Sequence, residues 1–403
     1  MNILMFSNDR AIFEKDSSVR VRLLEQVEFA GKLHVIVLGT KGTGTAEEKV
    51  GKHLIIYSTQ STSRFFYMSD AYHLGRRIIQ KHKDDWLVTA QDPFWSGPAA
   101  FLLARTSGSA FHLQLHTDIF SRGWRGRSLL RRLLHPWLFF RDMNELRSLL
   151  ERLLYPMALF LLRHADGVRV ISERLARSVR SLGVPAERIT KVPIFTDTQY
   201  FFNATPTFDL HRSYPDFSRI VLSIGRLQPE KNYHGLIRAF ARVHKEHDDA
   251  LLLIVGSGPE RERLLFLAAS LGLEDCVKIL PWARDVATYY KTCDVYVQPS
   301  TYEGWGLAVI EAMASGAPVV MTDVGCAGEI VIPEETGLVV PVGDEKVLTH
   351  AISRLLDNHA FALTLATNGH REVKKLATKA ETLMLYKTSW QQALLRGHQR
   401  RKN

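Results

Sequence analysis

The chain has few cysteines and no long apolar run. Its three cysteines, Cys276, Cys293 and Cys326, match no metal-binding spacing and cannot form an even set of disulfides. The longest strictly apolar run, 153–162, has ten residues including Pro156, whereas a helix that spans a bilayer needs about 20. The start, MNILMFSNDR, lacks the basic flank and the cleavage site of a signal peptide. We therefore expect a cytoplasmic protein in a reducing compartment, without a membrane-spanning helix.

Net charge is missing from the second half of the chain. Residues 1–200 contain 29 Lys and Arg against 19 Asp and Glu, whereas residues 201–403 contain 23 of each, so the first half carries the whole net charge of +10. A uniform excess would favour a general binder of nucleic acid, whereas the uneven distribution argues against that function. It indicates instead that one domain meets an acidic partner.

Apolar runs rich in β-formers alternate with helical patterns along the whole chain, which is long enough for two domains of roughly 150–200 residues. Near-continuous apolar strands separated by helices indicate parallel sheets covered on both faces. We therefore predict an α/β fold with two doubly wound domains whose ligands bind beyond the carboxyl ends of the strands. The expected strands are 3–7, 34–38, 54–57, 86–89, 111–115, 168–171, 220–224, 251–255, 277–280, 295–298, 319–321 and 338–340.

The expected domain boundary lies where the pattern breaks. The stretch NATPTFDLHRSYPDF, from residue 203, contains two prolines and several turn-forming residues. We assign 1–203 to a basic, acceptor-binding domain and 204–385 to a domain that binds a nucleotide sugar. Residues 386–403 are expected to form a C-terminal helix and a basic tail, with a return to the first domain as one option.

A short cationic turn follows the expected strand 220–224. The sequence GRLQPEKN, residues 225–232, leads from this strand into a helix. Arg226 offers a planar fork to two phosphate oxygens, Lys231 offers a compact charge, and a helix N-terminus adds unpaired N–H groups. The turn is therefore a candidate diphosphate site, with two solvated loop cations as the plain alternative.

Two glutamates bracket a glycine-containing turn after the expected strand 295–298. The segment PSTYEGWGLAVIEAMASGAPVV, from residue 299, places Glu303 in a loop and Glu311 about one turn into a helix that begins near Gly306. Glycines before a helix let backbone N–H groups approach a ligand closely. Two carboxylates on either side of such a loop can each accept hydrogen bonds from vicinal hydroxyls, as on a sugar and a ribose.

Both segments resemble motifs of one family. The segment around Glu303 and Glu311 resembles the Glu-x7-Glu signature of the retaining family 4 glycosyltransferases of the GT-B fold, and GRLQPEKN resembles the phosphate-binding motif of that family. They occur in the family's order, about 75 residues apart, and each lies between a strand and a helix. The resemblance, which covers residues 218–345, implies two Rossmann-like domains that face an interdomain cleft.

The resemblance also implies roles for individual residues. It implies that Arg226 and Lys231 hold the donor diphosphate, and that Glu303 accepts hydroxyls of the donor sugar. Glu311 is implied to hold the hydroxyls of the ribose. Further contacts with the donor are implied for Gly225, Gly304, Trp305, Gly306, Leu307, Trp282 and Ala283.

Polar residues also follow expected strands of the first half. Asp92 comes after 86–89, and His116 and Asp118 come after 111–115. His116 resembles the histidine that the family places beside the donor sugar, although a lone histidine beside a strand is often structural. Asp118 is a candidate to orient His116, and Asp92 is a candidate to position the acceptor hydroxyl. Many family members have a glycine pair after the first strand, whereas this chain has no glycine before Gly31.

Residues 121–163 combine basic and aromatic side chains. They contain nine Arg against three acidic residues, so this segment accounts for +6 of the net charge. Arg with Trp and Leu at helical spacing is typical of a helix that lies in an anionic membrane surface. The alternative is a buried helix with a solvated basic face. We expect contact with the membrane, with the protein peripheral on the inner face.

These features predict a retaining hexosyltransferase of polysaccharide biosynthesis. It would move a hexose from a UDP- or GDP-linked donor to a hydroxyl of a cell-envelope glycan or of a lipid-linked acceptor. The chain has no Asp-x-Asp pair, which commonly holds a divalent ion in such enzymes, so neither a metal nor another cofactor is expected. A GT-B nucleotide-sugar epimerase, a glycan phosphorylase and a basic protein that binds nucleic acid or a membrane surface remain as alternatives.

Overall fold

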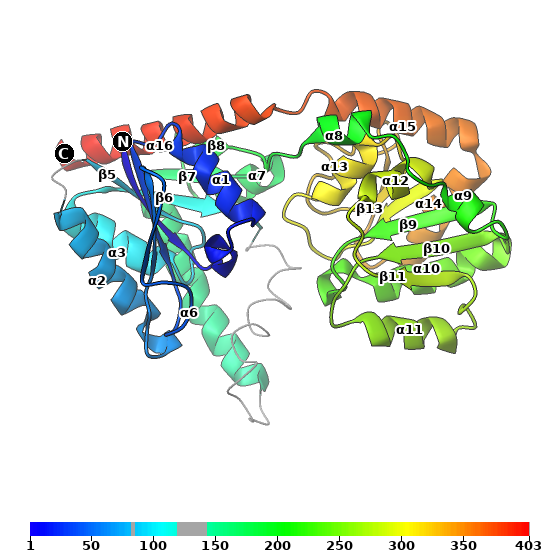
Figure 1. Cartoon of the computed structure of the whole chain (residues 1–403), viewed down its shortest axis with the longest axis horizontal. Coiled ribbons are helices and arrows are strands. Elements are labelled where there is room, and N and C mark those ends of the chain that lie inside the picture. The colour runs from blue at the N-terminus through cyan, green and yellow to red at the C-terminus, as the bar shows by residue number, and fades with distance from the viewer. Residues whose placement is uncertain (82–84, 119–142, 403) are drawn as a thin grey trace. The chain divides into compact units, whose positions relative to one another are not determined.

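The computed structural model describes residues 1–81, 85–118 and 143–402, which form two compact units (Figure 1). Unit 1 comprises Met1–Pro193 and Lys379–Asn403, and unit 2 comprises Ile194–Thr378. The sequence predicts the first boundary after residue 203, but the structure places it after Pro193. The reason is that helix α8 (Thr198–Asn203) packs against α13 (Leu307–Ala314) of unit 2. The second boundary lies before residue 386, because the C-terminal helix α16 already begins at Lys379.

Unit 1 is built on an eight-stranded sheet with the order β3-β4-β2-β1-β5-β6-β7-β8. All neighbouring strands are parallel except β3 and β4, which pair antiparallel. The central strands are buried on both faces, as expected of a parallel sheet covered by helices. The strands are β1 (Asn2–Ser7), β2 (Lys32–Val37), β3 (Glu47–Val50), β4 (Leu54–Ser58), β5 (Trp86–Ala90), β6 (Ala110–Leu115), β7 (Gly167–Val170) and β8 (Ile189–Lys191).

Helices cover both faces of this sheet (Figure 1). Ile3 and Met5 of β1 share a buried cluster with Trp390 of α16. On the opposite face, Gly75 of α2 lies so close to Leu4 and Phe6 that a Cβ there would approach both side chains to within 3.3 Å. The helices of unit 1 described by the structure are α1 (Ser18–Val27), α2 (Tyr67–Gln80), α3 (Gly97–Ser107), α6 (Met143–His164), α7 (Glu173–Ser181) and α16 (Lys379–Lys402).

Helix α16 returns the chain to unit 1. Its Trp390 is completely buried. Two glycines allow the helix to approach the sheet closely, because a Cβ at Gly167 would lie 2.8 Å from Ala393 and a Cβ at Gly397 would lie 2.5 Å from Ala110. Burial of the Trp390 side chain and close packing at these glycines together hold this helix on unit 1.

Unit 2 is built on a six-stranded parallel sheet with the order β11-β10-β9-β12-β13-β14. The order reverses between the adjacent strands β9 and β12, and loops that follow strands at such a switch point are where doubly wound sheets bind ligands. Its strands are β9 (Arg219–Ile224), β10 (Ala250–Val255), β11 (Val277–Leu280), β12 (Val295–Gln298), β13 (Val319–Thr322) and β14 (Leu338–Val340). The remaining helices of unit 2 are α9 (Leu210–Ser213), α10 (Tyr233–Glu246), α11 (Arg261–Ser270), α12 (Val286–Thr292), α14 (Glu345–Asp357) and α15 (His359–Val373).

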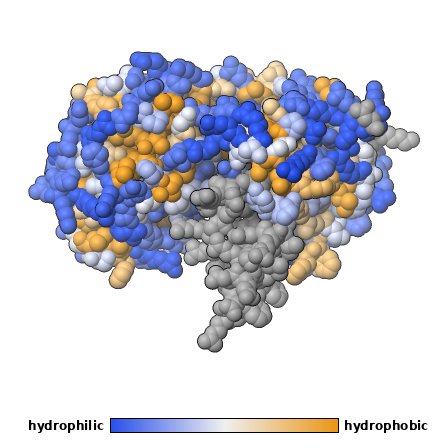
Figure 2. Space-filling model, turned by 180° about the vertical axis from the view of Figure 1, so that it is seen from behind, coloured by the Kyte–Doolittle hydropathy of each residue, from blue (hydrophilic) through white to orange (hydrophobic). Residues whose placement is uncertain are grey.

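The surface mixes polar and apolar side chains. On the face drawn in Figure 2, hydrophobic areas are interrupted by hydrophilic ones. Within the part of the chain that the structure describes, no helix is both long enough and apolar enough to cross a bilayer.

Candidate functional site

Two loops of unit 2 meet at the switch point of its sheet. One follows β9 and spans 225–232, and the other follows β12 and spans 299–306. The Asn232 side-chain amide donates to the Pro299 carbonyl at 3.2 Å, and the Thr301 N–H donates to the Glu230 carbonyl at 2.8 Å. Asn232 has a left-handed backbone (φ 53°), which ends one loop and begins α10. These bonds fix the two loops to each other.

An ion pair joins these loops. Lys231 Nζ lies 2.6 Å from Glu303 Oε1, and the two side chains are only 14% and 12% exposed. The structure thus brings together the two residues that the sequence assigned to the diphosphate and the sugar. Little exposure strengthens a charged hydrogen bond, since water competes weakly for either partner.

A buried polar cluster lies beneath Glu303. The same oxygen, Oε1, also accepts hydrogen bonds from Gln298 Nε2 at 2.7 Å and from Ser300 Oγ at 2.8 Å. Gln298 and Ser300 are buried, and the Tyr296 hydroxyl donates to the Gln298 side-chain carbonyl. Burial, and then the charge of Glu303, raise the pKa of nearby Tyr233 far above its ordinary value, so this phenol stays neutral.

Glu311 lies on the first turns of α13. Its Oε2 accepts a hydrogen bond from the buried Tyr290 hydroxyl at 3.2 Å. Burial raises the pKa of Glu311, while the Tyr290 hydrogen bond and the charge of Lys231 oppose that rise. A carboxylate in such surroundings gains from further hydrogen-bond donors, which vicinal hydroxyls can provide.

The N-terminus of α13 offers backbone donors that have no acceptor among the described residues. The first intrahelical bond runs from the Val309 N–H to the Gly306 carbonyl, so the N–H groups of Gly306, Leu307 and Ala308 precede the ladder. Gly306 has φ 98°, a conformation that strongly favours glycine. Trp305 is buried, and its carbonyl accepts from the Cys326 N–H at 2.8 Å. Together with Gly304, these residues form the turn expected from the sequence.

Arg226 and Gly225 lie at the open end of β9. The Arg226 side chain is 64% exposed, and its Nη2 lies 3.8 Å from Glu230. A Cβ on Gly225 would lie 2.8 Å from the Tyr233 hydroxyl, so a larger residue would collide with this buried tyrosine. Gly256, after β10, packs so closely on the Gly225 carbonyl that any side chain would collide with it. The loop that carries Arg226 is therefore held by backbone packing.

Trp282 and Ala283 lie in the loop between β11 and α12. Trp282 is 58% exposed, and its N–H donates to Ser257 Oγ at 3.4 Å. This bond joins the loop after β11 to the loop after β10. Both loops follow neighbouring strands, β10 and β11, at one edge of the sheet of unit 2. The contact with a nucleobase that the resemblance implies stays a prediction.

Asp92 organises a turn in unit 1. Its Oδ1 accepts from the N–H groups of Phe94 and Trp95 at 2.8 and 2.6 Å. Its Oδ2 accepts from Ser96 Oγ at 2.6 Å and from the Asn8 side chain at 2.7 Å. These bonds give Asp92 a structural function ahead of α3, and its action on an acceptor hydroxyl stays a prediction.

His116 follows β6, and its imidazole is neutral at physiological pH. Burial and the positive charges of Arg169 and Arg22 lower its pKa to about 3. Asp118 accepts a hydrogen bond from Ser178 Oγ of α7 at 3.3 Å. His116 can thus act as a donor or an acceptor of a hydrogen bond, but not as a cation.

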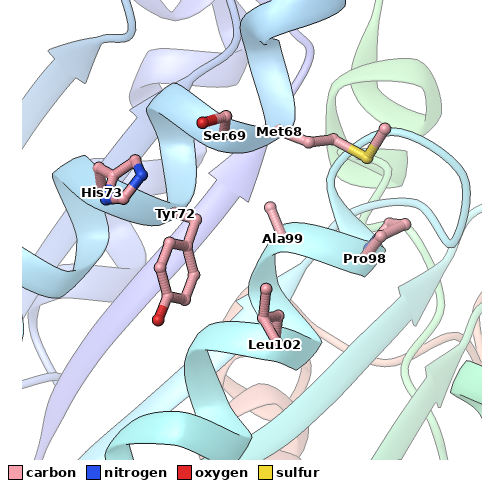
Figure 3. A pocket seen from close by; sticks show the side chains of 7 residues that line it. All are labelled: Met68, Ser69, Tyr72, His73, Pro98, Ala99 and Leu102. Carbon is pink, nitrogen blue, oxygen red and sulfur yellow. The ribbon is translucent and has the colours of Figure 1, made fainter.

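A shallow hollow lies elsewhere in unit 1, between α2 and α3. Its volume is about 360 Å³, and its lining includes Met68 and His73 of α2 and Leu102 of α3 (Figure 3). None of the residues that the sequence assigned to a site lines it. Of the basic segment 121–163, residues 121–142 lie outside the part of the chain that the structure describes. Residues 143–163 form most of α6.

Two family models cover most of the chain. One, described as Glycosyltransferase Family 4, matches residues 25–200, and the other, described as Glycosyl transferases group 1, matches residues 212–372. The chain belongs to the family 4 glycosyltransferases. Its fold is the GT-B fold predicted from the sequence, with two α/β units built on largely parallel sheets.

Solved structures support the same fold for this family 4 member. It superposes on sucrose-phosphate synthase from Thermosynechococcus elongatus with a TM-score of 0.75 and 23% identity, over 97% of this chain and 98% of that one. It superposes on Anabaena HepE, solved in complex with UDP-glucose, with a TM-score of 0.68 and 19% identity, over 97% and 98% of the two chains.

A curated relative matches this family 4 member over a shorter region. The lipopolysaccharide core biosynthesis glycosyltransferase LpsE of Rhizobium meliloti is 32% identical over 156 residues, which are 39% of this chain and 45% of the relative. The chain spans less than two thirds of the length of the first curated relatives that it matches.

The sequence did not single out Gln298, Ser300 or Tyr290. Gln298 and Tyr290 lie within an apolar strand and a helical pattern, where a buried polar side chain looks like part of the core. The available signal was a glutamine at the carboxyl end of an apolar strand, next to a motif that begins with Pro299 and Ser300.

Proposed function

We propose that the protein transfers a hexose from a nucleoside diphosphate sugar to a hydroxyl of a cell-envelope glycan or of a lipid-linked acceptor. The observation that carries this proposal is the Lys231–Glu303 pair between two loops at the switch point of unit 2. A cation beside a carboxylate suits a ligand that has a diphosphate next to a sugar. LpsE supports an envelope glycan as the product, and the UDP-glucose complex of HepE supports a UDP-linked donor, with GDP as the second candidate.

The charge of the departing diphosphate is neutralised by protein groups in this proposal. Arg226 and Lys231 supply two cations, and the N–H groups before Val309 supply donors at the positive end of α13. Neither a metal ion nor a cofactor is required. Glu311 binds the ribose hydroxyls, which compensate for the burial that raises its pKa.

We propose that the reaction retains the configuration of the sugar. In this proposal Glu303, whose Oε1 is held by three hydrogen bonds, positions the sugar and does not act as a nucleophile. The departing phosphate then helps to take the proton from the acceptor hydroxyl on the same face of the sugar. His116 contributes a neutral imidazole that can hydrogen bond to the donor sugar, since its pKa is about 3.

Unit 1 is proposed to bind the acceptor at an anionic membrane surface. The support is the charge distribution, because the whole excess of +10 lies in residues 1–200 and +6 of it lies in 121–163. Each basic group near such a surface contributes on the order of 1 kcal/mol, so several arginines suffice for reversible binding.

Release of nucleoside diphosphate from UDP- and GDP-linked hexoses tests the proposal. The wild-type protein should release UDP or GDP, and Glu303→Ala and Arg226→Ala should each lower the rate by 10-fold or more. Arg261→Ala is the matched control, because this arginine is 46% exposed and, among the described residues, pairs only with its neighbour Glu262. If both site variants kept full activity while replacement of the arginines in 121–132 abolished it, the proposal would be wrong.

A further inference from the structure

We propose that Gln298 and Ser300 are positioning residues that hold Oε1 of Glu303 and so keep its Oε2 available for a hydroxyl of the donor sugar. This inference rests on the proposed function and concerns two residues to which the sequence assigned no role. It concerns how the carboxylate is oriented, whereas the proposed function concerns what the carboxylate binds.

The hydrogen bonds to Glu303 are asymmetric. Gln298 Nε2, Ser300 Oγ and Lys231 Nζ all donate to Oε1, at 2.7, 2.8 and 2.6 Å. Among the described residues, none donates to Oε2 within hydrogen-bond distance. A carboxylate oxygen that accepts three bonds has little remaining capacity, so the other oxygen is the one that can accept from a ligand.

The direction of the Gln298 amide is set by its neighbours. The Tyr296 hydroxyl donates to Gln298 Oε1, so the amide NH₂ faces Ser300 Oγ, at 2.8 Å, and Glu303. Ser300 Oγ accepts a hydrogen bond from this NH₂ group and donates one to Glu303 Oε1. Every donor of the Gln298 amide is therefore used, and reversal of the amide would place two carbonyl-type oxygens against each other.

The cluster is rigid and shielded from water. Gln298 is 1% exposed and Ser300 is 0% exposed. The Ser300 carbonyl accepts from Thr322 Oγ1 of β13 at 2.5 Å, and the Val297 carbonyl accepts from Ser223 Oγ of β9 at 2.6 Å. Residues on supported strand ends hold a functional group more accurately than residues on loops.

Lys231 alone would not select between the two oxygens of Glu303. An ammonium group is a compact charge with three rotatable donors, and it can pair with either oxygen. A buried amide and a buried hydroxyl have fixed directions, so they convert an ion pair into a defined orientation. A misplacement of about 1 Å at a reacting group can lower a rate by about 100-fold.

The test uses the variants Gln298→Met and Ser300→Ala. It measures binding of UDP and GDP, and both binding and hydrolysis of UDP-glucose and of a GDP-linked hexose. Both variants should bind the sugar-free nucleotides within twofold of wild type, and their kcat for hydrolysis of the donor should fall by 10-fold or more. Ser315→Ala is the matched control, because this serine of unit 2 is also buried but its Oγ has no hydrogen-bond partner in the described chain. It should keep wild-type kcat.

A double-mutant cycle with Glu303→Ala separates positioning from general damage. If Gln298 and Ser300 act through Glu303, their replacement should cost nothing further once Glu303 has become Ala. Additive losses, or an equal loss of affinity for UDP and for UDP-glucose, would overturn the inference. If the wild-type protein bound none of these four ligands, the proposed function would itself be contradicted, which is a different outcome.

Gln298→Glu provides a second readout if the apolar variants fold poorly. The introduced carboxylate has the same shape but repels Glu303 when ionised, and it can donate to Glu303 only when protonated. The kcat of this variant relative to wild type should therefore rise as the pH falls. A ratio of kcat values that does not change with pH would contradict the inference.

Discussion

At the scale of single residues, the candidate site depends on how buried carboxylates are compensated. Glu303 has three donors on one oxygen, one of them a lysine, whereas Glu311 has a single tyrosine hydroxyl. Hydrogen-bond donors are thus concentrated on Glu303, whereas burial leaves Glu311 with a raised pKa. Groups with such shifted pKa values are concentrated at functional sites, where a bound ligand can supply the hydrogen-bond donors that the folded protein does not provide.

Glu311→Gln should make the ligand-free protein more stable at neutral pH. Because folding raises the pKa of Glu311 above its ordinary value, ionisation of this carboxyl opposes folding. That penalty is absent below the unfolded pKa and grows as the pH rises through the folded pKa. The variant should therefore melt above wild type at pH 7.5, and the two melting temperatures should converge near pH 4.

Thermal melts at several pH values in the absence of nucleotide provide this comparison. Tyr290→Phe is a useful companion variant, since it removes the hydroxyl that donates to Glu311 and keeps the ring. It should lower stability at neutral pH. A pH-independent difference between wild type and Glu311→Gln would show that Glu311 carries no burial penalty.

At the scale of elements, the sequence predicted strands better than it predicted packing. All twelve expected strands occur, and β3 and β8 were missed. The sequence of β3 is Glu-Glu-Lys-Val on an exposed edge, and β8 has only three residues, so neither has an apolar pattern. The boundaries of the two units were misplaced because they depend on what α8 and α16 pack against, which a local pattern does not contain.

The same limit applied to the candidate site. The loops at 225–232 and 299–306 were predicted because their glycines and charges stand out between a strand and a helix. Gln298 was not predicted, because the direction of its amide depends on Tyr296, Ser300 and Glu303 together.

Trp390→Ala should destabilise unit 1 by about 3–5 kcal/mol, because the ring is completely buried and its loss leaves a large cavity. Leu395→Ala on the same helix is the control, since this leucine is 62% exposed and should change stability by less than about 0.5 kcal/mol. Denaturant unfolding measures both values. Equal effects would mean that α16 does not pack on the sheet as described.

His112 connects the sheet of unit 1 to α16. It lies between Thr89 Oγ1 at 2.9 Å and Ser389 Oγ at 3.0 Å, and burial and Arg169 lower its pKa to about 3. Between pH 6.5 and pH 3 only the unfolded chain takes up this proton, so stability falls as the pH drops through that range.

His112→Gln should weaken this pH dependence. Between pH 7.5 and pH 5, the wild-type protein should lose about 2 kcal/mol more of its free energy of unfolding than the variant loses. Urea unfolding at the two pH values measures the difference. Parallel losses in the two proteins would place His112 outside the acid-sensitive part of the fold.

At the scale of the whole molecule, the net charge and the candidate donor-binding residues lie in different halves of the sequence. The excess of +10 lies in residues 1–200, and residues 201–403 are neutral yet contain Lys231, Glu303 and Glu311. The proposed donor site thus needs only local charges. A basic surface on the other half suits an anionic partner that is recognised independently of the nucleotide.

Binding to vesicles tests the proposed membrane contact. The protein should sediment with vesicles that contain anionic lipid, and binding should fall steeply with added salt and in Arg131→Ala/Arg132→Ala. Neutral vesicles are the control for apolar insertion. Binding that is insensitive to salt, or equal on neutral and anionic vesicles, would contradict an electrostatic contact by this segment.

The most direct test of the central claim is a thermal-shift comparison of UDP, GDP and ADP on the wild-type protein and on Lys231→Met. The account predicts that UDP or GDP raises the melting temperature of the wild-type protein, because a ligand that binds only the folded state stabilises it. It predicts that Lys231→Met loses most of that shift, since Lys231, which lies beside Glu303, is the cation proposed to bind the diphosphate. No shift with any nucleotide, or an equal shift in the variant, would contradict it.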